Sequence, residues 1–182
     1  MGAAIGLVEL SSIAKGIEVA DAMVKRAQVD LVVNRTICPG KYMVLIGGNV
    51  EEVRNSVDTG VDVGGHQVVD SLVIPNLHPT VFPAISQTAH VPEARALGVI
   101  EAFSVASIIE AADAAAKASE VQLLEIHLAM AIGGKGWVMF TGEVSDVEAS
   151  VEAGAEVVSR RGLLVQTVVI PSPRKEVLQQ FI

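Results

Sequence analysis

The sequence predicts an α+β fold in which one small β-α-β-β-α-β domain occurs twice in tandem. Three observations predict it: an internal repeat over nearly the whole chain, the order of strand and helix patterns within each copy, and a composition suited to an aliphatic core. Of the 182 residues, 51% are hydrophobic and only 3% are aromatic. Ala, Val, Leu and Ile must therefore fill the interior.

Sliding the sequence along itself reveals the repeat. Residues 4–9 (AIGLVE) recur as residues 96–101 (ALGVIE), and matches then continue in order to the end of the chain. Further matched pairs are Ser12 and Ser104, Asp21 and Asp113, Lys25 and Lys117, Lys41 and Lys135, and Pro75 and Pro171. This order indicates duplication, with a first domain at 1–87, a linker at 88–95 and a second domain at 96–182.

The first half of each copy predicts a strand, a helix and a second strand. Residues 4–10 are apolar with β-branched content, and residues 29–36 form a similar run. Ser12 is placed to cap a helix that extends to about Ala27. Its predicted apolar face consists of Ile13, Ile17, Ala20 and Val24.

The second half of each copy predicts a turn, a strand, a helix and a final strand. The turn is Cys38-Pro39-Gly40, and strands follow at 41–48 and 67–74, the last stopped by Pro75. Asn49 and Glu52 have the spacing of a capping box, opening a helix whose apolar stripe is Val50, Val53 and Val57. A short terminal helix can follow. This order is typical of ferredoxin-like domains, whose antiparallel sheet carries helices on one face.

Charge and hydropathy exclude several function classes. The net charge of −8 argues against nucleic acid and anionic membranes as partners. The most apolar stretch, residues 123–140, is interrupted by Glu125, His127 and Lys135. The first ten residues do not resemble a signal peptide, so we expect a cytoplasmic location.

No catalytic constellation is recognisable, so we expect no enzyme. His66, His90 and His127 lack ligand spacing and are expected to be surface or strand histidines. Residues 133–136 (GGKG) do not match a phosphate-binding loop, because Trp137 follows. Glu9 and Glu101 are repeated with the fold, which favours a structural role.

The residues alone leave two further questions open. Cys38 is the single cysteine, and it is either a small buried hydrophobe near a turn or a metal ligand shared between chains. Tris-thiolate zinc is then one option.

Lys25 and Lys117 lie late on the first helix of each copy, where a solvated lysine suits the helix dipole.

Together the repeated residues resemble the bacterial microcompartment (BMC) shell domain. The resemblance rests on Gly-x-x-Glu in the first strand, the Asp and Lys of the first helix, the Gly-Lys loop, and Val-Ile-Pro followed by a basic residue. Within this family, the loop TICPGK (36–41) is similar to tandem-domain shell proteins of propanediol-utilisation microcompartments.

The resemblance implies a structural tile rather than a catalyst. Three chains would form a pseudohexameric disc that packs edge to edge with itself and other shell proteins. It implies pore loops at Cys38, Pro39, Gly40, Ala131, Ile132, Gly133 and Gly134, and tile edges at Lys25, Lys117, His78 and Arg174. It also implies one [4Fe–4S] cluster per trimer, bound by three copies of Cys38, for electron transfer across the shell or to an encapsulated redox enzyme.

Two alternatives remain at this point. The first is the same tile without a cluster, whose pore conducts a small metabolite. The second is a ferredoxin-like small-molecule sensor, because such regulatory modules also repeat β-α-β-β-α-β. A tile forms extended sheets, whereas a sensor stays a discrete oligomer whose melting temperature shifts with a ligand.

Overall fold

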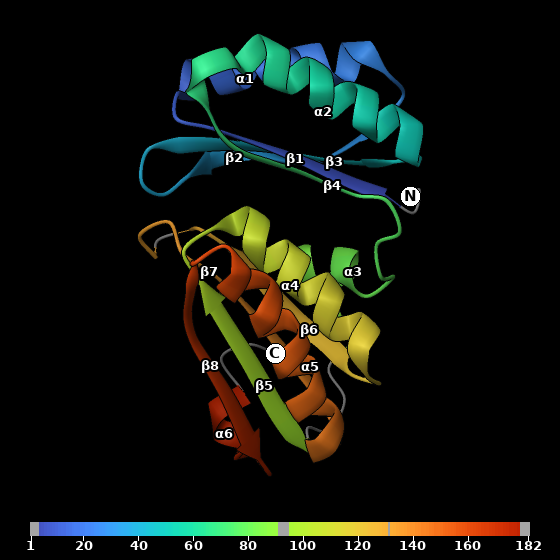
Figure 1. Cartoon of the computed structure of the whole chain (residues 1–182), viewed down its shortest axis with the longest axis vertical. Helices are drawn as coiled ribbons and strands as arrows, with labels where there is room; N and C mark the ends of the chain where they lie inside the picture. The colour runs from blue at the N-terminus through green and yellow to red at the C-terminus, as the bar shows by residue number, and fades with distance from the viewer. Residues whose placement is uncertain (1–3, 91–94, 131, 179–182) are drawn as a thin grey trace. The chain divides into compact units, whose positions relative to one another are not determined.

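The computed structural model describes residues 4–90, 95–130 and 132–178, and it divides into two compact units. The first unit is Met1–Leu77 and the second is His78–Ile182. Each unit contains one four-stranded antiparallel sheet with two long helices across one face (Figure 1). The predicted α+β fold, repeated in tandem, is confirmed.

The first unit follows the predicted order of elements. Its sheet has the strand order β2-β3-β1-β4, so the first strand lies between the third and the fourth. The elements are β1 (Ala4–Leu10), α1 (Ile13–Arg26), β2 (Asp30–Ile37), β3 (Lys41–Gly48), α2 (Val50–Gly64), a short 3₁₀ turn η1 (Gly65–Gln67) and β4 (Val68–Ile74).

The second unit repeats this arrangement with the strand order β6-β7-β5-β8. A short helix precedes the repeat and another follows it. The elements are α3 (Val81–Ile85), β5 (Ala96–Ala102), α4 (Val105–Ala118), β6 (Gln122–Leu128), β7 (Gly136–Gly142), α5 (Val144–Arg160), β8 (Leu164–Pro171) and α6 (Lys175–Leu178).

Three helix N-termini show why these helices begin where they do. The hydroxyl oxygens of Ser12 and Ser104 accept from the amides of Lys15 and Ser107, at 3.3 and 3.2 Å. The side-chain oxygen of Asn49 accepts from the Glu52 amide at 3.1 Å. The serine cap and the Asn49 cap predicted from the sequence are confirmed.

The predicted apolar face of α1 is wrong for Ile13, Ile17 and Val24, which are 42%, 57% and 39% exposed, and right for Ala20, which is buried. The buried face consists instead of Gly16, Val19, Ala20 and Met23. The helix carries two apolar stripes, and the one with Gly16 faces the sheet because a residue without a side chain lets the helix approach Tyr42 closely.

The segment between the two repeats packs with the second copy. The sequence places the end of the first domain at 87, and the compact units divide after Leu77. The segment that follows forms α3, which packs on β6 and α4 of the second unit. Val81 and Ala84 are buried there, so their apolar side chains explain why the segment joins that unit.

Candidate functional site

The predicted ligand Cys38 lies in the turn that joins β2 to β3. Ile37 before it is buried, the free Cys38 is half-buried, and Pro39 and Gly40 are exposed. Gly40 has a φ of 68°, and a Cβ placed on it would meet no atom within 4 Å. The turn therefore presents the cysteine beside an open, uncrowded tip.

A buried ion pair holds the base of this turn. Lys41, the first residue of β3, places its Nζ 2.7 Å from Oε1 of Glu9 on β1. Only 4% of the Glu9 side chain is exposed, so the lysine supplies the charge partner that a buried carboxylate requires. The repeat identifies Glu9 as structural, but its pairing with Lys41 is visible only in the structure.

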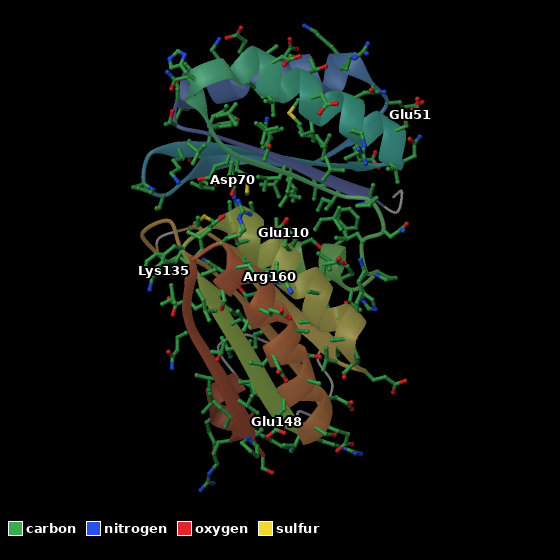
Figure 2. All side chains as sticks on the ribbon, in the orientation of Figure 1. Glu51, Asp70, Glu110, Lys135, Glu148 and Arg160 are labelled. Atoms are coloured by element: carbon green, nitrogen blue, oxygen red, sulfur yellow. The ribbon has the colours of Figure 1, made fainter. Side chains whose placement is uncertain are left out.

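The second copy repeats this pair at its own loop. Lys135 Nζ lies 2.5 Å from Oε1 of Glu101, and Lys135 projects from the loop between β6 and β7 (Figure 2). Both loops are thus anchored by a lysine on a carboxylate of the central strand. The signal that could have found these pairs is that both members recur in the repeat.

The second predicted pore loop is longer than the first. Gly133 and Gly134 adopt φ values of 68° and 88°, and Ile132 is half-buried beside them. The Ala129 amide donates to the Lys135 carbonyl at 3.1 Å and closes the loop. The remaining predicted loop residue, Ala131, lies outside the described residues.

The predicted edge lysines occupy equivalent positions. Lys25 and Lys117 each lie 2.5 Å from the aspartate one turn earlier, Asp21 and Asp113. Lys25 is largely exposed and Lys117 is less so. Each lysine is therefore held along its helix by an ion pair, and their role at a tile edge stays a prediction.

The two other predicted edge residues differ from each other. The His78 amide donates to Oδ1 of Asp113 at 2.7 Å, and its ring Nδ1 lies 2.8 Å from the Thr80 hydroxyl. Arg174 is exposed and precedes α6. The structure brings His78 close to the Lys117 pair through the shared carboxylate of Asp113, and it does not bring Arg174 there.

A metal site within one chain is not formed by the described residues. Among them, no group of three or more His, Cys, Asp or Glu side chains could hold a metal ion. Cys38 fits a metal cluster only as one ligand among several from different chains, which its place at an open turn permits.

Each copy exposes an apolar surface. In the first, α1 exposes Ile13, Ile17 and Val24. In the second, the sheet face away from its helices forms a groove of about 380 Å³. The groove is lined by Leu97, Val99, Trp137, Met139, Val168, Ile170 and Val177.

One chain therefore exposes one apolar helix stripe on its first copy and one apolar sheet groove on its second. We call these surfaces the α1 stripe (Ile13, Ile17, Val24) and the β5 groove.

No helix among the described residues is long and apolar enough to cross a membrane.

Comparison with known families gives a direct match. The family model for the BMC domain matches twice, at residues 4–77 and 96–173. The chain is also 47% identical to the bacterial microcompartment shell protein PduT of Citrobacter freundii, over 100% of this chain and 99% of the relative.

More distant and structural relatives agree. The carboxysome assembly protein CcmO of Synechocystis is 31% identical over 92% of this chain and 61% of its own length. A crystal structure of a microcompartment protein from Desulfitobacterium hafniense superposes with a TM-score of 0.92, at 52% identity, covering 97% of this chain and 98% of that one.

Proposed function

The chain belongs to the BMC domain family and is a structural microcompartment shell protein of the PduT type, and on this premise we propose that three copies form a ring of six domains with a [4Fe–4S] cluster at its centre. Its relatives are a microcompartment shell protein and a carboxysome assembly protein, so the proposed role involves no turnover of a substrate.

The proposed ring is supported by two apolar surfaces, one on each copy. The α1 stripe and the β5 groove are both apolar and lie on opposite copies. A chain that presents two different surfaces joins the next chain head to tail, and such interfaces generate rings when the rotation closes. Each chain carries two BMC domains, so three chains would supply the six domains of the proposed ring.

The proposed cluster is supported by the position of the single cysteine. One thiol per chain is a poor metal site, but three Cys38 thiolates around a threefold axis can hold three irons of a cubane. The fourth iron is then left to water or an outside ligand. When bound, the cluster would supply one-electron transfer, and the Cys38 turn would hold it at the centre of the ring.

The edge residues complete the proposal. Lys25, Lys117, His78 and Arg174 are assigned to the rim of the tile, where they would contact neighbouring shell proteins. The exposed Lys25 ammonium supports this assignment, because it can donate to carbonyls of an adjacent tile while Asp21 orients it.

The cluster is tested by anaerobic purification of the wild type beside Cys38→Ser. We expect a brown protein with about four irons per three chains and an EPR signal after reduction, and a colourless variant. Cys38→Ser must keep the oligomeric mass of the wild type, which serves as its control. If the wild type stays colourless and free of iron after cluster reconstitution, the cluster is wrong and a plain shell tile remains.

A further inference from the structure

The segment that follows β4 is tied to a helix of the second unit by one carboxylate. Oδ1 of Asp113, on α4, accepts the His78 amide at 2.7 Å, and Oδ2 of the same side chain lies 2.5 Å from Nζ of Lys117. Three residues after His78, Val81 is buried where α3 packs on β6 and α4. The carboxylate and the buried valine together hold residues 78–85 against the second unit.

The segment that follows β8 repeats these residues in its own form. The repeat makes Arg174 the counterpart of His78, and Val177 the counterpart of Val81. Arg174 is exposed, and Val177 is 51% exposed and lines the β5 groove. Leu178, next to it, packs on β5 and β7. The segment is therefore anchored on its own sheet while Arg174 and Val177 face outward.

The carboxylate that would receive such a segment is also repeated. Asp21 on α1 is the counterpart of Asp113, and its Oδ2 lies 2.5 Å from Nζ of Lys25. Within the described part of the chain, no hydrogen-bond donor contacts the other oxygen, Oδ1 of Asp21. The Asp21 side chain is 58% exposed. The first copy thus displays the same aspartate–lysine pair as the second, with one carboxylate oxygen open to a donor from outside.

Asp21 borders the α1 stripe. It follows Ile17 by four residues and precedes Val24 by three, so the three residues lie on one side of the helix. The β5 groove is bordered in turn by α6, through Val177. When the α1 stripe lies in the β5 groove of another chain, Asp21 is on the side of the helix that faces that chain.

We propose that residues 172–178 of one chain dock on α1 of the next chain, with the Arg174 amide donating to Asp21 and Val177 packing beside the α1 stripe. This contact between chains repeats the contact that residues 78–85 make within a chain. It rests on the proposed ring, because the ring sets a second copy beside the first copy of the next chain. It uses the backbone of Arg174, so the assignment of its side chain to the tile rim is unchanged.

Dissociation of the assembly tests the contact. Analytical ultracentrifugation of the full-length protein measures the concentration at which the mass of three chains falls to that of one. We expect Asp21→Ala to raise this concentration by about tenfold or more, because each chain loses a hydrogen bond to a charged group. Asp21→Asn keeps an acceptor oxygen and should have a smaller effect. Asp21 is exposed, so neither change should unfold the chain.

Two variants serve as matched controls. Lys25→Met removes the partner of Asp21 within its own helix and should leave the dissociation unchanged, because an exposed ion pair contributes little. Asp58→Ala removes an exposed aspartate of α2 in the same copy and should also leave it unchanged. An effect of Lys25→Met equal to that of Asp21→Ala would assign the loss to the ion pair and overturn the contact.

Hydrogen exchange at the Arg174 amide locates the contact. The amide should exchange slowly in the assembly, and faster in Asp21→Ala and after dilution to single chains. If the wild type does not dissociate at any measurable concentration, the comparison with Asp21→Ala decides alone. Protection that survives dilution but is lost in Asp21→Ala places the contact within one chain and overturns the proposal.

The contact and the ring fail in different ways. Equal exchange of the Arg174 amide in the wild type and Asp21→Ala overturns the contact, and a wild type that keeps the mass of three chains then leaves the ring standing. A wild type that never exceeds the mass of one chain overturns both. Iron content does not enter these measurements, so the proposed cluster is tested separately.

Discussion

At the scale of single residues, the two copies solve the same packing problem with large and small residues exchanged. In the first copy Gly16 of α1 packs against Tyr42 of β3, and in the second Ile108 of α4 packs against Gly136 of β7. These are equivalent positions of the repeat. The space between the helix and the sheet is thus filled in both copies. A strand residue fills it in the first copy, and a helix residue fills it in the second.

Gly16→Ala tests this packing. Its Cβ would lie 2.4 Å from the Tyr42 ring and 2.5 Å from the Tyr42 Cβ, so the side chain cannot move aside by a rotation of its far end alone. We expect a loss of about 1–3 kcal/mol in the free energy of unfolding, measured by urea denaturation.

The double variant Gly16→Ile with Tyr42→Gly transplants the second copy's pair and provides the control. It should be less destabilised than the sum of its two single changes, since residues in contact are not additive. A wild-type stability for Gly16→Ala, or strict additivity in the double variant, would contradict the packing argument.

At the scale of elements, a buried serine joins the two long helices of each copy. Ser56 of α2 donates to the Met23 carbonyl and Ser150 of α5 donates to the Ala115 carbonyl, both at 2.9 Å. Both serines are fully buried. The sequence matches these serines in the repeat, but only the structure shows that each binds the backbone of the preceding long helix.

We expect Ser56→Ala and Ser150→Ala each to lower the free energy of unfolding by about 0.5–1.5 kcal/mol, because each leaves a buried carbonyl without its donor. Ser107→Ala is the matched control. The Ser107 hydroxyl is buried on α4 and has no hydrogen-bond partner among the described residues, so its removal should leave stability unchanged or raise it. Thermal unfolding of the three variants checks the contrast, which fails if Ser107→Ala costs as much as the other two.

At the scale of the whole molecule, the two copies of the duplicated chain expose different apolar surfaces. The first exposes the α1 stripe and the second exposes the β5 groove. An asymmetric chain of this kind suits a head-to-tail ring. This accounts for isoleucines on α1 that face away from their own sheet.

Ile17→Glu should break the ring, because Ile17 is the most exposed residue of the α1 stripe and a charge there would be buried without a partner. We expect light scattering after size exclusion to show a fall from the mass of three chains to that of one, with an unchanged circular dichroism spectrum. Phe103→Glu is the control, since Phe103 is 60% exposed and lies outside both surfaces. An unchanged mass for Ile17→Glu would exclude the α1 stripe as the interface.

The sequence by itself determined the duplicated fold, the strands, the serine and asparagine caps, and the family. These follow from local chemistry and from the repeat, which shows the same pattern twice. It also singled out Cys38 and the glycine loops. Only the tertiary structure decided which stripe of α1 is buried, because both stripes have helical spacing and the close approach at Gly16 selects between them.

The tertiary structure also decided which side chains meet. The pairing of Lys41 with Glu9 and the stacking of His127 on Trp137 join residues from different strands, and strand register brings them together. From the sequence, His127 is expected to be an ordinary strand histidine, because no ligand spacing surrounds it. In the structure its ring nitrogens lie 3.3 Å from Oε1 of Glu125 and 3.0 Å from the Met130 carbonyl oxygen, and the bend of the chain after β6 brings that carbonyl to the ring.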